Sequence, residues 1–135
     1  MSLKCLPQIY TDGSCLKNPG GNGGWAFTLL ENGEQWSMVG NENSTTNNRM
    51  ELQAIIEALN FVQGPEYIIY TDSELTMKCA VGIYSRKKNK DLWEKYDKAL
   101  NGRKLHWVWI KAHNGNLYNE YVDILARLEA KSIKK

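Results

Sequence analysis

Two aspartates end identical tetrapeptides in this chain of 135 residues, and carboxylates in such positions can do chemistry. The sequence Ile-Tyr-Thr-Asp occurs at residues 9–12 and again at residues 69–72. Each copy is a short apolar, β-branched and aromatic run that stops at polar residues, which is typical of a buried strand. If the strands are neighbours in one sheet, a metal ion, a shared proton or a nearby cation must offset the repulsion between Asp12 and Asp72. Taken singly, each aspartate could instead begin a turn or cap a helix.

Three further residues could act with this pair, although each also has a plainer explanation. Glu51 falls on the apolar face of an expected helix at residues 49–62. A carboxylate there is costly unless it is paired or ligates something, but it could also interact favourably with the helix dipole. Asp123 lies on the polar flank of the last expected helix and could pair with Arg127, four residues later. His113 could be an ordinary histidine of a polar loop.

The elements that must position these residues are strands and helices in alternation. Expected strands cover residues 9–12, 25–30, 35–40, 67–72 and 103–110, and expected helices cover residues 49–62, 74–81, 91–100 and 117–131. Asn32-Gly33 predicts a tight hairpin between the second and third strands. This order predicts an α/β fold with a mixed sheet and helices on its faces. The functional crevice of such a sheet lies near the carboxyl ends of its strands.

Composition and loop chemistry exclude several classes of protein. With 42% hydrophobic and 24% charged residues the chain is typical of a soluble globular protein, and its length fits one domain over residues 1–135. The net charge of +2 gives no global positive field, and the basic runs at residues 86–90 and 131–135 could be ordinary solvated surface. The glycine-rich loop at residues 13–24 precedes a strand-like run, whereas nucleotide-binding loops need a helix to follow. Three cysteines without paired spacing, and no signal or membrane segment, favour the cytoplasm.

The motifs occur in one fixed order that resembles type I ribonuclease H. They are Asp12-Gly13-Ser14, Asn18-Pro19-Gly20, Thr45-Thr46-Asn47-Asn48-Arg49-Met50-Glu51-Leu52, Thr71-Asp72-Ser73, His113 and Asn119-Glu120-Tyr121-Val122-Asp123. The resemblance extends from Ile9 to about Ala130, and residues 45–52 are its most specific part. It implies the ribonuclease H-like fold, a mixed five-stranded sheet with helices on both faces. In that sheet a three-stranded antiparallel meander is followed by two parallel strands.

The resemblance implies endonucleolytic hydrolysis of the RNA strand of RNA–DNA hybrids, leaving 5′-phosphate and 3′-hydroxyl ends. Asp12, Glu51, Asp72 and Asp123 would hold two Mg²⁺ ions, with Mn²⁺ as an alternative. By analogy Asp12 bridges both ions, Asp123 helps to hold the ion that activates water, and Glu51 with Asp72 holds the ion at the leaving group. His113 would assist proton transfer or product release. Mg²⁺ prefers oxygen ligands, and two ions about 3.5–4 Å apart can clamp both sides of a phosphodiester.

The resemblance also implies contacts with the hybrid, made by a monomer. Four residues match positions that line the minor groove, where a protein can reach the 2′-hydroxyls of RNA: Cys15, Asn18, Asn47 and Asn48. Thr46 matches a contact to a DNA phosphate. Gly13, Glu74 and Asn119 are further expected substrate contacts. The basic segment would add Arg86, Lys87, Lys88 and Lys90.

Two departures from the family pattern bear on affinity. Glu74 stands where relatives usually have glutamine, so a minor-groove amide donor is replaced by an acceptor-only carboxylate. The segment between Gly82 and Asp91 is far shorter than the basic, tryptophan-bearing handle of many free-standing relatives. We therefore expect weaker, steeply salt-dependent binding. Alternatives are a catalytically weak hybrid-binding module, the ribonuclease H domain of a reverse transcriptase, or another nuclease task of the same fold.

Overall fold

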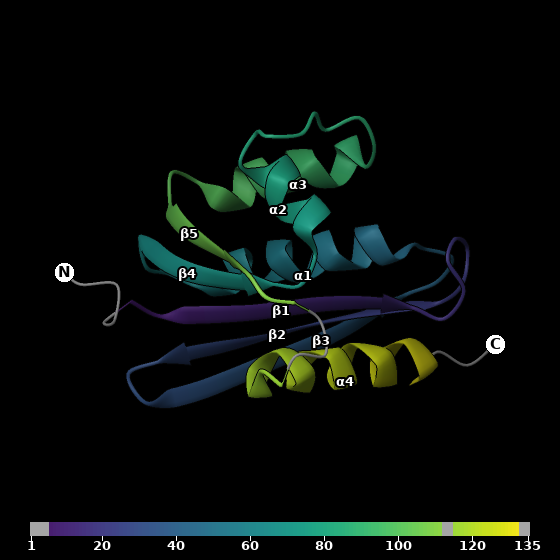
Figure 1. Cartoon of the computed structure of the whole chain (residues 1–135), viewed down its shortest axis with the longest axis horizontal. Helices are drawn as coiled ribbons and strands as arrows, with labels where there is room; N and C mark the ends of the chain where they lie inside the picture. The colour runs from purple at the N-terminus through teal and green to yellow at the C-terminus, as the bar shows by residue number, and fades with distance from the viewer. Residues whose placement is uncertain (1–5, 112–114, 133–135) are drawn as a thin grey trace.

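The computed structural model describes residues 6–111 and 115–132, which form a sheet with helices on both faces (Figure 1). The strands are β1 (Gln8–Cys15), β2 (Gly23–Glu31), β3 (Glu34–Glu42), β4 (Glu66–Thr71) and β5 (Lys104–Trp109). The helices are α1 (Asn47–Phe61), α2 (Glu74–Ala80), α3 (Lys90–Leu100) and α4 (Leu117–Ser132). The predicted α/β fold is confirmed, because these elements have the expected types and order.

The sheet has the strand order β3-β2-β1-β4-β5. Strands β1, β2 and β3 form an antiparallel meander, and β4 and β5 continue it in parallel with β1. The repeated tetrapeptides lie side by side in register, because Ile9 pairs with Ile69 and Tyr10 with Tyr70. The two tyrosine rings stack at a centroid distance of 4.3 Å and an interplanar angle of 5°. This register brings Asp12 and Asp72 to the same edge of the sheet.

Most strand boundaries differ from the prediction by one or two residues, and the end of β1 differs by three. The first strand was expected to end at Asp12, but β1 continues to Cys15, which pairs with Gly23 of β2. Its parallel pairing with β4 stops earlier, at Tyr10 and Tyr70. The tetrapeptide therefore marks the end of the β1–β4 pairing but not of the β1–β2 pairing. Asp12 lies on a part of β1 that pairs with β2 alone.

Turn and cap residues account for the connections. Asn32 and Gly33 both have positive φ, 52° and 79°, which is the backbone geometry that a two-residue hairpin of the predicted type requires. The side chain of Thr46 caps α1 by accepting a hydrogen bond from the backbone N–H of Arg49. Arg103 donates to the carbonyl oxygens of Leu59, Val62, Gly64 and Ala99, which lie at or just beyond the ends of α1 and α3. Carbonyl groups that lack helical partners are thereby satisfied.

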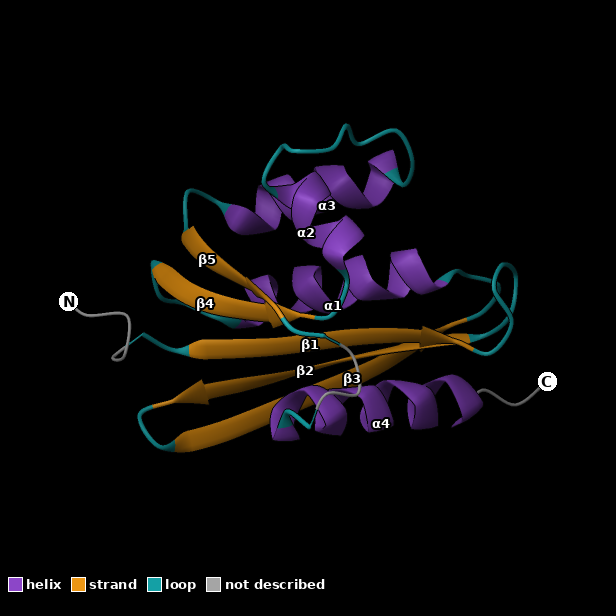
Figure 2. Ribbon diagram, in the orientation of Figure 1, coloured by secondary structure: helices purple, strands orange, loops and turns teal. Residues whose placement is uncertain are grey.

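The sheet divides the apolar core into two layers, each covered by helices. Helices α1, α2 and α3 lie on one side of the sheet and α4 lies on the other (Figure 2). The larger cluster includes Ile9, Phe27, Ile55 and Ile69, while a smaller one joins α4 to the sheet around Tyr10, Ala26, Val122 and Ala126. Among the described residues, no helix combines the length and the apolar character needed to cross a membrane.

Replacing Gly24 with alanine should destabilise the fold, because α4 packs directly on this part of β2. A Cβ atom there would overlap the carbonyl oxygen of Ala126 and lie 2.6 Å from the backbone nitrogen of Ala130. Helix backbone cannot yield cheaply, so we expect a loss of about 1–3 kcal/mol in the free energy of unfolding. Urea denaturation would measure it. Gln35→Ala on exposed β3 is the control and should change stability by less than about 0.5 kcal/mol.

Candidate active site

Three carboxylates from three different elements meet at the edge of the sheet. Asp12 lies on β1, Glu51 on α1, and Asp72 directly after β4. Each offers an oxygen, and these oxygens all lie within 4.8 Å of one another. Asp12 is 2% exposed and Glu51 is 7% exposed. An all-oxygen donor set of this kind suits a hard divalent cation such as Mg²⁺ or Mn²⁺.

Gly13 allows α1 to approach β1 closely enough to bring two of these carboxylates together. Its backbone N–H donates to Asp12 Oδ1 at 2.8 Å and to Glu51 Oε1 at 3.0 Å. A Cβ atom at this position would overlap the backbone of Met50 and Glu51. The glycine expected to contact substrate is therefore first a packing residue, and its N–H already serves both acids.

Burial makes the charged forms of these acids costly. It raises the pKa of Asp12 to about 7, and the negative charge of Asp72 adds to this, whereas hydrogen bonding to Glu51 and Gly13 opposes it. The pKa of Glu51 is raised well above its ordinary value, chiefly by burial and then by the charge of Asp12. Without a cation the pair therefore retains protons at pH values where exposed carboxylates are fully ionised.

Glu51 does not interact with the start of its helix as the plainer explanation required. The helix α1 begins at Asn47, two residues before the expected start, and its first turn contains no acidic residue. Glu51 is buried as its apolar spacing predicts, and its Oε2 has no hydrogen-bond partner among the described residues. A buried carboxylate oxygen without a partner is costly, and a bound cation would remove that cost. The residues present therefore fit a divalent cation.

Asp123 lies beside this group and also forms the ion pair expected from its spacing. It lines the same hollow as Asp12, Glu51 and Asp72. Its Oδ2 lies 3.1 Å from a guanidinium nitrogen of Arg127, one turn further along α4. The fourth acid is thus close enough to share the site while an arginine balances its charge.

The hollow collects most of the expected minor-groove residues. It has a volume of about 380 Å³ and is lined by Asp12, Gly13, Ser14, Cys15, Asn47, Asn48, Glu51, Asp72, Ser73 and Asp123. Asn18 lies next to it, and its side-chain oxygen accepts a hydrogen bond of 3.1 Å from the backbone N–H of Asn47. The thiol of Cys15 donates to the carbonyl oxygen of Lys17 at 3.0 Å, which folds the glycine-rich loop back on itself.

Other expected contacts lie outside the hollow. Glu74 is exposed in the first turn of α2, 3.7 Å from the ammonium group of Lys78. Asn119 is 3% exposed on α4. Lys87 and Lys88 line a neighbouring cavity that also includes Asn48. Lys90 is exposed as the first residue of α3, and the hydroxyl of Thr46 caps α1. His113 lies outside the described residues.

Arg86 differs most from its expected role as a free basic contact. All three of its guanidinium nitrogens donate to groups of the protein itself: the carbonyl oxygens of Cys79 and Ala80 and the carboxylate of Asp97. A charge run such as that at residues 86–90 does not reveal which of its cations turns inward. In this chain the inward one is the arginine.

Sequence reasoning also missed two contacts made close to the acidic residues in the chain. The indole N–H of Trp109 donates to the backbone carbonyl of Asp72 at 3.2 Å. Arg49, inside the most specific motif, forms a bidentate pair with Asp91 at 2.8 and 3.0 Å. The alternating pattern around Trp109 did not predict its contact with Asp72. For the pair between Arg49 and Asp91, the only signal in the sequence was the polar position of Arg49 close to Glu51.

Comparisons with known proteins agree with the fold described above. The family model described as RNase H matches residues 7–131. The ribonuclease H of Campylobacter jejuni subsp. jejuni serotype O:23/36 (strain 81-176) is 45% identical over 137 residues, covering 95% of this chain and 93% of that protein. The ribonuclease H of Ehrlichia ruminantium (strain Gardel) is 42% identical over 134 residues, covering 88% and 90%. The crystal structure of LC11-RNase H1 in complex with RNA/DNA hybrid is similar with a TM-score of 0.79 at 25% identity, covering 93% of this chain and 96% of that one.

Replacing Asp12 with asparagine should stabilise the metal-free protein, by an amount that depends on pH. Because the pKa of Asp12 is about 7 in the folded protein and lower in the unfolded chain, the folded state binds the proton more tightly. The free energy of unfolding should therefore fall as pH rises from about 4 to 7. We expect Asp12→Asn to add on the order of 1–3 kcal/mol at pH 8 and to flatten this dependence.

Denaturation in urea and chelator from pH 4.5 to 8 would measure the effect. Mg²⁺ or Mn²⁺ should stabilise the wild type more than the variant, because Asp12 would help to bind the ion. Glu34→Gln on exposed β3 serves as the control for loss of one negative charge. A destabilised Asp12→Asn protein at pH 8 would mean that Asp12 is structural.

Proposed function

Because the chain belongs to the RNase H family of nucleases, we propose that it hydrolyses the RNA strand of RNA–DNA hybrids with divalent cations bound at Asp12, Glu51 and Asp72. The observation that carries this proposal is the meeting of three carboxylate oxygens within 4.8 Å, two of them on buried side chains. Binding of a hybrid is supported by the similarity to LC11-RNase H1, whose structure is a complex with RNA/DNA hybrid.

In this proposal the acidic group would hold two Mg²⁺ ions, or Mn²⁺ in their place, with Asp123 as the fourth ligand. Bound ions of this kind supply an activated water and stabilise the leaving oxygen, which is the chemistry that gives 5′-phosphate and 3′-hydroxyl ends. Gly13 and the strand register fix the acids in advance, so little rearrangement is needed when substrate arrives. Arg127 holds the carboxylate of Asp123 close to the site. His113 would serve in proton transfer or product release.

The residues around the acids would read the substrate. Asn47 and Asn48 lie at the first turn of α1 and line the hollow together with Cys15, so their side chains can reach the 2′-hydroxyls that distinguish RNA from DNA. Asn18 contacts the backbone of Asn47 and extends the same surface. Thr46 and the exposed lysines 87, 88 and 90 would contact phosphates.

A module that binds hybrids without cutting them is the main rival. Its carboxylates would repel the phosphates of the substrate and would gain nothing from being buried. Burial of Asp12 and Glu51 at the expense of stability is reasonable only if the acids are used together with a cation. We also place the protein in the cytoplasm, a reducing compartment where the free thiols of Cys15 and Cys79 would persist.

A cleavage assay tests the proposal directly. The wild type should cut the RNA strand of an end-labelled hybrid in Mg²⁺ or Mn²⁺, but should not cut in chelator and should leave single-stranded RNA and duplex DNA intact. Asp12→Asn should lower the rate on the order of 10³-fold or more, because a cation ligand is lost. Glu34→Gln is the matched control. Absence of metal-dependent cutting by the wild type would refute the proposal.

Glu74→Gln should bind the hybrid more tightly. The substitution removes a negative charge near a polyanion and restores an amide donor at the start of α2. We expect a dissociation constant lower by about three- to tenfold in dilute salt, measured by fluorescence anisotropy. Glu94→Gln on α3 is matched, because Glu94 also pairs with a lysine four residues later. Equal affinities for wild type and Glu74→Gln would remove Glu74 from the substrate surface.

A further inference from the structure

The short connection between α2 and α3, which we call the basic strap (residues 82–89), is held in place by two arginines. The first, Arg86, belongs to the strap and donates through Nε to the carbonyl of Cys79 at 3.1 Å and through Nη2 to that of Ala80 at 3.2 Å. These carbonyls belong to the last turn of α2, where no helical N–H remains to satisfy them. Nη1 of Arg86 lies 2.9 and 3.0 Å from the two carboxylate oxygens of Asp97 on α3.

The guanidinium of Arg86 also stacks on aromatic rings of α3. Its central carbon lies 4.4 Å from the ring centroid of Trp93 and 5.5 Å from that of Tyr96. Both rings are nearly buried, and they meet edge to face at 5.3 Å. Arginine suits this place because its planar group stacks and donates in several directions at once, which an ammonium group cannot do.

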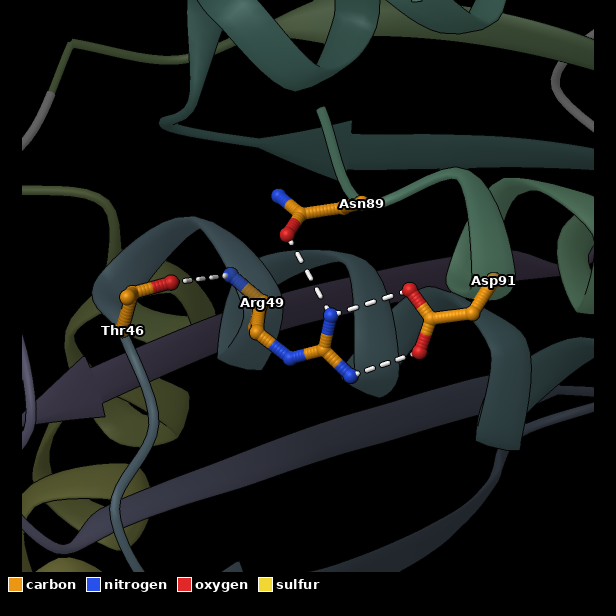
Figure 3. Close-up of polar contacts among 4 residues, drawn as sticks. All are labelled: Thr46, Arg49, Asn89 and Asp91. Atoms are coloured by element: carbon orange, nitrogen blue, oxygen red, sulfur yellow. Dashed lines mark hydrogen bonds and ion pairs between the residues drawn. The ribbon is translucent and has the colours of Figure 1, made fainter. Parts of the chain in front are cut away.

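The second arginine, Arg49 of α1, holds the end of the strap, where the chain turns into α3 (Figure 3). Its guanidinium forms the bidentate pair with Asp91 and also donates to the side-chain oxygen of Asn89 at 3.3 Å. This pairing lowers the pKa of Asp91 to about 2. Asn89 has a φ of 58°, a left-handed conformation that asparagine tolerates better than most residues. Its side chain makes no cap for α3, because Arg49 uses the oxygen instead.

Between these two anchors the strap presents its lysines beside the acidic group. Lys87 and Lys88 line a cavity of about 300 Å³ whose wall also includes Leu52, Cys79 and Trp93. Asn48 belongs both to this cavity and to the hollow of the carboxylates. Both lysines are exposed, so their ammonium groups can meet phosphates that run past the acids.

We propose that Arg86 is a positioning residue for the hybrid: it touches no substrate, but its clamp on α2 and α3 holds Lys87 and Lys88 where the nucleic-acid backbone passes. The proposal rests on the proposed function, since it needs a hybrid at the site. In a free loop of this length, two lysines would lose conformational entropy on every binding event. The clamp removes part of that cost in advance, because it fixes the backbone that carries the two lysines.

Binding measurements can tell whether Arg86 acts by positioning the two lysines or only by its positive charge. Anisotropy with a labelled RNA–DNA hybrid would be recorded from 50 to 200 mM salt, in the Asp12→Asn background to prevent cutting. Arg86→Lys keeps the charge but loses the planar group. We expect it to weaken binding about tenfold and to reduce the slope of log affinity against log salt by up to about two units, one for each lysine that no longer meets a phosphate. In cleavage assays with proteins that keep Asp12, Arg86→Lys should raise KM and leave kcat almost unchanged.

A double-substitution cycle sharpens the test. Lys87→Gln with Lys88→Gln should weaken binding as Arg86→Lys does, and adding Arg86→Lys to that pair should weaken it no further. Lys98→Gln, which removes an exposed charge from α3, should have almost no effect. Wild-type affinity in Arg86→Lys, or effects that add in full, would overturn the inference.

If the Arg86→Lys protein folds poorly, a second variant can still test the clamp. Asp97→Asn removes only the exposed half of the clamp, so it should fold and show a smaller decrease of affinity in the same direction. Full affinity in Asp97→Asn together with an unstable Arg86→Lys protein would make Arg86 purely structural. If the Asp12→Asn protein fails to bind hybrid and the wild type fails to cut it, the proposed function fails. If only the Arg86 and Asp97 variants behave like their parent, the clamp inference alone fails.

Discussion

The arrangement of this protein depends on holding three carboxylates close together, two of them buried and the third half-buried. Their mutual repulsion and their burial both oppose folding, as the raised pKa values of Asp12 and Glu51 indicate. The fold supplies the opposing constraints. The β1–β4 register sets the two aspartates side by side, and the apolar face of α1 carries Glu51 into the core with Ile55 and Leu59. The N–H of Gly13 donates to both Asp12 and Glu51.

Much of this could be predicted from the sequence because the signals were local. Alternating and apolar runs marked every strand and helix, and Asn32-Gly33 marked its hairpin through the positive φ that it needs. The burial of Glu51 followed from its spacing with Ile55 along one helix. The full extent of β1 did not follow, because it is determined by pairing with Gly23 of β2, and a strand's own sequence does not show where its partner ends.

The basic segment shows the limit of local signals most clearly. Five consecutive polar residues gave no reason to separate Arg86 from the lysines that follow it. What separates them is non-local: the free carbonyls of α2, the ring of Trp93 and the carboxylate of Asp97 converge on one point. Spacing along the chain cannot reveal that convergence. The same holds for Arg49, whose partner Asp91 is 42 residues away.

The distant contacts of Arg86 and Arg49 bear on an electrostatic conflict between the acidic site and its substrate. A nuclease site of this kind must concentrate negative charge, yet its substrate is a polyanion and the net charge of the chain is only +2. Positive charge spread evenly over the surface would do little, because salt screens it within about 8–10 Å. It must instead lie next to the acids without neutralising them. In the proposed clamp Arg86 anchors Lys87 and Lys88 on α2 and α3. These helices also pack against α1, so they would fix the distance between the two lysines and Glu51. Under the proposed function, the placement of charge, more than its amount, accounts for how so weakly basic a chain binds nucleic acid at an acidic site.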